Sequence, residues 1–131
     1  MKEITMLGYV MVGTNDIKKA ATFYDSIFTE MGVKREMENA DFILWNLGEG
    51  KTSFSISKPY DGNTACVGNG SMNAFYLSSN EEVDRMYALA IKLGASDEGA
   101  PGKREYDENF YAAYFRDLDG NKLNFFHYPM D

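Results

Sequence analysis

The stretch that decides the fold is Phe110–Tyr128, with the sequence FYAAYFRDLDGNKLNFFHY. Its two aromatic runs, Phe110–Phe115 and Leu123–Tyr128, flank a polar segment that contains Asp119-Gly120. Asp-Gly supplies the positive-φ positions of a tight turn, so the stretch predicts a β-hairpin. Alternation along the second run divides its side chains between the two faces of the sheet. One face carries Asn124, Phe126 and Tyr128, and the other carries Leu123, Phe125 and His127.

Two amphipathic helices are predicted upstream of this hairpin. Residues Asn15–Met31 and Glu81–Leu93 both place apolar side chains at helical spacing. Both segments also have residues that favour a defined start and a left-handed stop. These are Asn15 or Asp16 and the Ser79–Glu82 capping box at the starts, and Gly32 and Gly94 at the ends.

We read both halves of the chain as βαβββ, with four strands placed in the first half and three in the second. The strands are Gly8–Val12, Val33–Glu36, Phe42–Leu47 and Thr52–Ser57 in the first half, and Asn73–Leu77, Phe110–Phe115 and Leu123–Tyr128 in the second. Corresponding positions recur at a nearly constant offset, which indicates a duplication. We expect one domain, 1–131, with module one at about 4–58, a connector at about 59–70 and module two at about 71–128. The irregular segment Gly94–Asn109 is expected to lie over a cleft mouth.

Length, composition and net charge exclude several classes of function. A chain of 131 residues with 44% hydrophobic residues can bury a core. No apolar run is long enough to span a membrane, and the N-terminus lacks the pattern of a secretion signal, so we expect a cytoplasmic protein. The net charge of −7 argues against a nucleic-acid partner and suits a cationic small ligand. The single cysteine, Cys66, cannot form an internal disulfide.

Several short segments, taken in order, resemble one family. They are Tyr9–Val12, Asn15–Ile17, Phe23–Asp25, Gly68–Phe75, Glu82–Asp84, Leu93–Ala95, Gly99–Gly102, Tyr111–Tyr114 and Gly120–Leu123. Together they resemble the vicinal oxygen chelate superfamily of glyoxalase I, bleomycin-resistance proteins and extradiol dioxygenases, in its glyoxalase-like branch. The resemblance implies an α+β fold in which two tandem βαβββ modules build a cupped mixed β-sheet around a cleft, with helices outside.

The resemblance also implies where a metal would sit. Catalytic members hold a divalent metal through His, Gln or Glu on inward strand faces, and these positions fall on Tyr9, Ser55, Met72 and Asn124. A phenol, a hydroxyl, a thioether and a neutral amide do not displace water from first-row divalent metals. We therefore expect no metal and no cofactor.

The side chains expected to line the cleft are aromatic, methionine or small and polar, which is typical of a pocket for an organic molecule. They are Tyr9, Met11, Trp45 (or its neighbours Leu44 and Asn46), Ser55, Met72, Tyr76, Asn124 and Phe126. A filled core would have the same composition. The pocket is favoured because the polar members would otherwise need buried partners.

Other reactive side chains are predicted to be structural. His127 is the only histidine, and alternation turns it away from the face of Asn124. Asp117 and Asp119 are expected to be solvated residues of the hairpin turn. No nucleophile–base pair is evident, so no catalytic residue is predicted.

The leading hypothesis is a metal-free protein that binds a small aromatic or cationic organic molecule without transforming it. One alternative is an enzyme, either a glyoxalase-like lyase or dioxygenase with a non-standard site, or a metal-free catalyst that uses Tyr9, Tyr76 or Tyr114 as an acid. Another is a structural or partner-binding module with a closed cleft. A homodimer is expected, because many relatives assemble clefts from paired modules and exposed sheet edges favour association.

Overall fold

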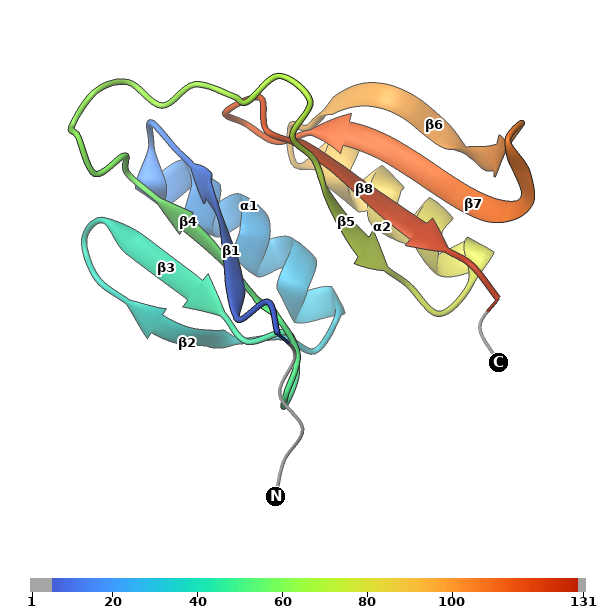
Figure 1. Ribbon diagram of the computed structural model, residues 1–131, viewed down its shortest axis with the longest axis horizontal. Helices are drawn as coiled ribbons and strands as arrows, with labels where there is room; N and C mark the ends of the chain where they lie inside the picture. Colours follow the sequence, from blue (N-terminus) through green and yellow to red (C-terminus); the bar gives the residue numbers. More distant parts are fainter. Residues whose placement is uncertain (1–5, 130–131) are drawn as a thin grey trace. The chain divides into compact units, whose positions relative to one another are not determined.

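In each half of the chain, one helix packs on one face of a four-stranded sheet (Figure 1). The computed structural model describes residues 6–129 and divides into two units between Cys66 and Val67. Both units have the order βαβββ, which confirms the predicted α+β fold of two modules. Within the described residues, no helix is long and apolar enough to cross a membrane.

Unit one orders its strands β1-β4-β3-β2, with β1 parallel to β4 and the other pairs antiparallel. Its elements are β1 (Tyr9–Gly13), α1 (Ile17–Glu30), β2 (Arg35–Glu38), β3 (Phe42–Trp45) and β4 (Ser53–Ser57). The strand expected at Val33–Glu36 therefore begins two residues later, because residues 33 and 34 still belong to the connection that leaves the helix.

Helix α1 begins and ends where its sequence predicts. The Asp16 side chain accepts a hydrogen bond from the Lys19 N–H at 3.1 Å, and Gly32 has a φ of 74°. Aromatic side chains from the buried face of α1 meet the sheet, and the Tyr24 ring lies 5.0 Å from that of Phe54. This aromatic core fixes which face of the first sheet is covered by its helix.

Unit two repeats the topology, with the strand order β5-β8-β7-β6. Strands β5 and β8 are parallel, and the other pairs are antiparallel. Its elements are β5 (Asn73–Tyr76), α2 (Asn80–Lys92), β6 (Ser96–Arg104), β7 (Asp107–Arg116) and β8 (Lys122–His127). Ser79 caps α2 by accepting from the Glu82 N–H at 3.1 Å, and Gly94 follows the helix with a φ of 109°.

Strand β6 corrects the expectation that Gly94–Asn109 is an irregular cover. This segment forms β6 and the start of β7. The glycines and Pro101 fit a strand because β6 lies at the edge of its sheet and its pairing with β7 shifts register at Gly99 and Gly102. Proline and bulges are tolerated at edges, where an N–H is not needed for pairing.

The predicted hairpin is confirmed as β7 and β8, but one aspartate in its turn is not solvated. Asp117 is only 6% exposed, and its Oδ1 accepts from the N–H groups of Asp119 and Asn121, both at 2.9 Å. Gly120 supplies the positive φ of 90°. Asp117 thus has the expected turn role, but it is buried because its carboxylate organises the turn from within.

The core of unit two lies between α2 and its sheet. Val83 and Met86 on the helix and Leu123 and Phe125 on β8 are fully buried. The side chains between these strand positions lie on the opposite face, as the alternation predicts. We call the face of each sheet that does not meet the helix of its own unit the open face.

Candidate functional site

The open face of the first sheet brings together three of the predicted cleft residues. Met11 lies opposite Ser55 in the register of β1 and β4, and Tyr9 lies opposite Ser53. Tyr9 is 56% exposed and Met11 is 52% exposed, whereas Ser55 is buried. The Ser55 Oγ donates a hydrogen bond to the carbonyl of Val10 at 2.8 Å. This hydroxyl is therefore satisfied by the backbone.

The connector forms an open pocket of about 1000 Å³ at the end of β1. Residues 58–66 make much of its wall, together with Met11 and Asp41. Asn15 fixes the connector by accepting from the Ala65 N–H at 2.7 Å and donating to the Ala65 carbonyl at 3.1 Å. The pocket is lined by a mixed set of polar and apolar side chains with no convergent group of acids or bases.

Trp45 does not lie on the open face, so its expected place in the cleft is wrong. Its ring packs 5.2 Å from that of Phe28 on α1, and its Nε1 donates to Asp25 Oδ1 at 2.9 Å. The neighbouring Leu44 lies opposite Ser55 instead. The large indole fills the core beneath the helix because its N–H finds a carboxylate there.

Asp25 links this tryptophan to a charge pair. Arg35 donates to Asp25 through Nη2 at 2.6 Å, and through Nε to both carboxylate oxygens. Burial raises the pKa of the Asp25 carboxyl, but the hydrogen bonds from Arg35 and Trp45 outweigh burial and leave the pKa below its ordinary value. The same pair raises the pKa of Arg35. This network holds α1 against β2 and β3 and is structural.

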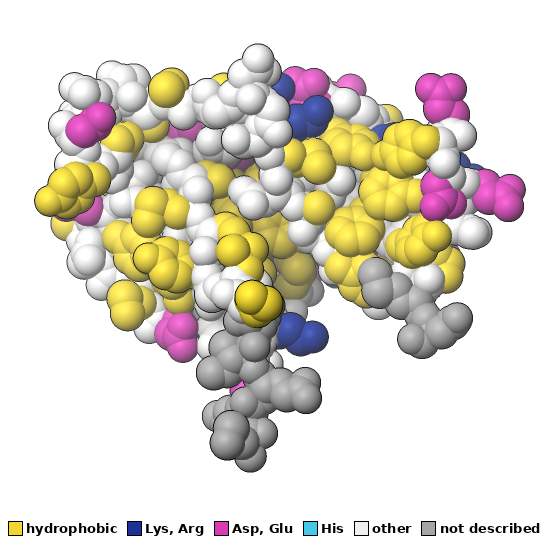
Figure 2. All heavy atoms as spheres, in the orientation of Figure 1, with side chains coloured by type: hydrophobic (Ala, Val, Ile, Leu, Met, Phe, Trp, Pro, Cys, Tyr) yellow, Lys and Arg dark blue, Asp and Glu magenta, His cyan; other side chains and the backbone are white. Residues whose placement is uncertain are grey.

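The open face of the second sheet is more aromatic. Asn124 lies between Ala74 on β5 and Tyr114 on β7, and Phe126 lies between Tyr76 and Ala112. The Tyr76 ring stands edge-on to that of Phe126 at 5.5 Å, and the Phe110 ring stacks on the other side at 5.5 Å. Figure 2 shows hydrophobic side chains gathered over β5, β7 and β8.

Met72 precedes β5, and β5 begins with Asn73 opposite Leu123. It is 43% exposed. The strand neighbour of Asn124 on β5 is thus Ala74, a small residue.

Asn124 is the most informative residue of this face. Its side chain is 1% exposed, and its Oδ1 has no hydrogen-bond partner among the described residues. A buried carbonyl oxygen without a partner costs about 1–3 kcal/mol. Such a group is rare in folded proteins and calls for a specific explanation. Residues 6–129 supply no N–H or O–H to this oxygen.

A cluster of cations and phenols borders Asn124, and sequence reasoning named only one of its members, Tyr114, as a possible acid. The guanidinium of Arg104 lies 5.0 Å from the centre of the Tyr114 ring, and Lys122 Nζ lies 5.5 Å from it. The hydroxyls of Tyr106 and Tyr114 are 3.1 Å apart. Their hydrogen bond is the largest influence that raises the pKa of Tyr106. We call Arg104, Lys122, Tyr106 and Tyr114 the basic corner.

The alternation of side chains along β8 could have predicted part of the basic corner. Lys122 lies two residues before Asn124 on the same strand, and Tyr114 pairs directly with Asn124. Arg104 had no such signal, because the strand that carries it was not predicted. The corner lines a pocket of about 450 Å³ together with Glu98, Gly99 and Ala100.

The side chains at the family's metal positions do not fit a divalent metal. Tyr9 and Met72 are about half exposed, Ser55 is hydrogen-bonded to the backbone, and Asn124 offers one neutral oxygen. Within residues 6–129, no three His, Cys, Asp or Glu side chains lie together as a metal-binding group. Imidazole, carboxylate or thiolate donors are what such metals require.

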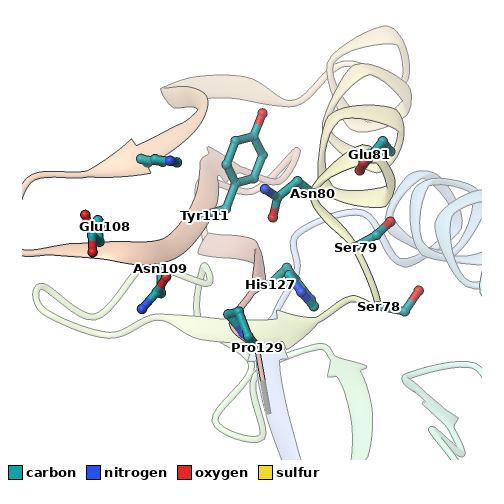
Figure 3. A pocket seen from close by; sticks show the side chains of 10 residues that line it. Ser78, Ser79, Asn80, Glu81, Glu108, Asn109, Tyr111, His127 and Pro129 are labelled. Atoms are coloured by element: carbon teal, nitrogen blue, oxygen red, sulfur yellow. The ribbon is translucent and has the colours of Figure 1, made fainter. Parts of the chain in front are cut away.

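His127 lies in a different place, a polar pocket of about 380 Å³ at the start of α2 (Figure 3). Its Nδ1 is 2.8 Å from the carbonyl of Leu77, which ties β8 to the end of β5. Tyr111 lines the same pocket and donates to Asp84 Oδ1 at 2.6 Å. This hydrogen bond, with burial and the charges of Asp84 and Glu81, raises the pKa of Tyr111 to about 12.

Residues 6–125 match the family described as the glyoxalase/bleomycin resistance protein/dioxygenase superfamily. No curated protein matches the chain. Among solved structures, a glyoxalase/bleomycin resistance protein from Albidiferax ferrireducens is 34% identical, with a TM-score of 0.85. The match covers 95% of this chain and 100% of that one.

Two further structures share the fold at lower identity. A glyoxalase/bleomycin resistance protein/dioxygenase family enzyme from Burkholderia phytofirmans is 22% identical, with a TM-score of 0.76 and coverage of 95% of this chain and 100% of that one. A lactoylglutathione lyase from Agrobacterium tumefaciens is 17% identical, with a TM-score of 0.67 and coverage of 94% and 93%.

Proposed function

Because the chain belongs to the glyoxalase/bleomycin resistance protein/dioxygenase superfamily, we propose that it binds a small aromatic molecule without a divalent metal and without transforming it. The site is the open face of the second sheet. The observation that carries the proposal is the buried Asn124 Oδ1 without a partner, next to a row of aromatic rings. A ligand that stacks on this row and donates to that oxygen removes the cost of the vacant acceptor.

The aromatic row supplies contact area for such a ligand. Tyr76 is partly exposed beside the less exposed Phe126, so a planar molecule that stacks on one of these rings meets the other edge-on. Aromatic pairs at these spacings contribute about 0.5–1.5 kcal/mol beyond the area that they bury. A hydrogen bond to a neutral acceptor adds about 0.5–1.5 kcal/mol, and more where the acceptor was buried and unpaired. Stacking gives affinity, and Asn124 gives selectivity for ligands with a donor.

The direct test compares two neutral aromatic amides. Benzamide carries N–H donors, and N,N-dimethylbenzamide has the same ring and carbonyl without them. Titration of the isotope-labelled protein should shift the amide signals of β7 and β8 with benzamide at several-fold lower concentration than with its dimethyl analogue. In Asn124→Leu the difference between the two ligands should disappear. If neither amide moves these signals, the proposal is wrong and a closed module is favoured.

The melting temperature in the presence of divalent cations tests whether the protein binds a metal. A cation bound preferentially to the folded state would raise the melting temperature, so Ni²⁺, Mn²⁺ and Zn²⁺ should leave it unchanged. The matched positive control is Met72→His with Asn124→Glu, which introduces two family-type donors and should gain a metal-dependent rise. Stoichiometric metal in the purified wild-type protein, or conversion of the bound amide, would favour the lyase or dioxygenase alternative.

A further inference from the structure

Three side chains of different chemistry follow one another on the open face of β8. Lys122, Asn124 and Phe126 alternate with core residues and therefore point to the same side. Successive same-face positions on a strand are about 7 Å apart. Read along the strand, the face presents a cation, a vacant hydrogen-bond acceptor and an aromatic ring.

The cationic end carries more positive charge than the acidic composition suggests. Neither Lys122 nor Arg104 has an ion pair with a carboxylate in the part of the chain that the structure describes. The nearby Glu98 is paired with Arg116, whose Nε lies 2.7 Å from its Oε1. The corner therefore attracts an anion although the whole chain has a net charge of −7.

Arg104 is held in place by the backbone of its own strand. Its guanidinium donates to the carbonyls of Ala100 at 3.1 Å, Gly102 at 3.2 Å and Gly99 at 3.4 Å. The register shifts of β6 at Gly99 and Gly102 bring these carbonyls around the side chain. Carbonyl oxygens orient the guanidinium but do not cancel its charge, so the field at the pocket stays positive.

The phenols of the corner add a donor. Tyr106 and Tyr114 share one hydrogen bond between their hydroxyls. Two hydroxyls carry two hydrogens, so one O–H is left to donate to a further acceptor. Both rings line the 450 Å³ pocket with Arg104 and Lys122. An anionic oxygen in this pocket would meet two cations and a phenol.

We propose that this face selects an aromatic ligand that carries an acidic group, with an N–H between the acid and the ring, as in N-aroyl amino acids. The acid faces Lys122 and the pocket of the basic corner, the N–H donates to Asn124 Oδ1, and the ring stacks beside Phe126. This inference rests on the proposed function and narrows its ligand. It also replaces the cationic ligand expected from net charge, because the local charge at this face is positive.

The test uses hippurate, which is N-benzoylglycine, with two matched analogues. Methyl hippurate keeps the ring and N–H but loses the negative charge. O-benzoylglycolate keeps the ring and charge, and an ester oxygen replaces the N–H. Isothermal titration calorimetry should give hippurate roughly tenfold higher affinity than either analogue, as expected for a charged contact and a buried hydrogen bond. The advantage over the methyl ester should shrink with added salt.

Two variants assign the contacts. Lys122→Gln should reduce hippurate affinity toward that of methyl hippurate, with Arg104 still facing the acid, and Asn124→Leu should reduce it to near that of O-benzoylglycolate. Lys103→Gln removes an exposed cation from a different pocket and should leave the affinity unchanged.

The inference is overturned if hippurate does not bind, if its methyl ester binds equally well, or if Lys122→Gln has no effect. Benzamide separates this failure from failure of the proposed function. If benzamide binds in an Asn124-dependent manner but hippurate gains nothing, the function stands and the acidic ligand is wrong. If neither binds, both are wrong.

Discussion

Replacing Asn124 by leucine should stabilise the protein in the absence of ligand. The substitution removes a buried amide whose Oδ1 has no partner and puts an apolar side chain of similar size beside Ala74 and Tyr114. An unpaired buried acceptor costs about 1–3 kcal/mol, and an apolar replacement of similar shape recovers much of it. We expect the free energy of unfolding to rise by about 1–2 kcal/mol. For a cooperative unit of 60–100 residues, each kcal/mol raises the melting temperature by about 4–8 °C.

Two probes locate the effect. Urea unfolding followed by far-ultraviolet circular dichroism reports on both units, whereas fluorescence of the single tryptophan, Trp45, reports on unit one. The gain should therefore appear in the circular dichroism transition and in hydrogen exchange of β8. The matched control is Ser55→Ala, which removes a buried hydroxyl that has a partner. It should lower stability by about 0.5–1.5 kcal/mol.

The test depends on Asn124→Leu raising the free energy of unfolding while Ser55→Ala lowers it. If Asn124→Leu lowers the free energy of unfolding by about 1 kcal/mol or more, the amide oxygen has a partner in solution. The argument for a vacant acceptor, and with it the basis of the proposed ligand site, would then be refuted.

Asp25→Asn keeps an acceptor for Trp45 but removes the charge that pairs with Arg35, so it should cost about 0.5–1 kcal/mol at neutral pH. Folding lowers the pKa of Asp25, so its ionised carboxylate stabilises the fold at pH values above the ordinary pKa of 3.8. The free energies of unfolding of wild type and Asp25→Asn, measured in urea, should therefore converge as the pH falls below 3.8 through the lower pKa of the folded state. Asp84→Asn should bring the Tyr111 pKa down from about 12 toward 10, and tyrosine ring NMR signals should titrate accordingly, with Tyr111→Phe identifying the signal. Edge strands β1, β2, β5 and β6 favour association, so sedimentation equilibrium should give a homodimer at micromolar concentration, and a monomer there would remove that proposal.

The helices and the hairpin could be predicted because their signals are local. The side chains of Asp16 and Ser79 bond to N–H groups three residues away, and Gly32 and Gly94 adopt the positive φ that ends each helix. Apolar spacing then fixed which side of each helix meets a sheet. Strand β6 was missed because its glycines and Pro101 are typical of loops, and only pairing with β7 makes it a strand.

The sequence by itself determined the two-module repeat except for strand β6, the family resemblance and the residues that alternate onto one face of β8. Period-2 alternation is a property of the strand alone, so Asn124 and Phe126 could be grouped from spacing. The tertiary structure decided that Trp45 faces α1, since both faces of β3 are apolar and only the partners Asp25 and Phe28 distinguish them. It also decided that Asn124 Oδ1 is vacant and that Arg104 joins Lys122 over Tyr114. Whether a buried polar group has a hydrogen-bond partner, and which charge dominates locally, both depend on residues distant in sequence. These residues come together only when the strands pair.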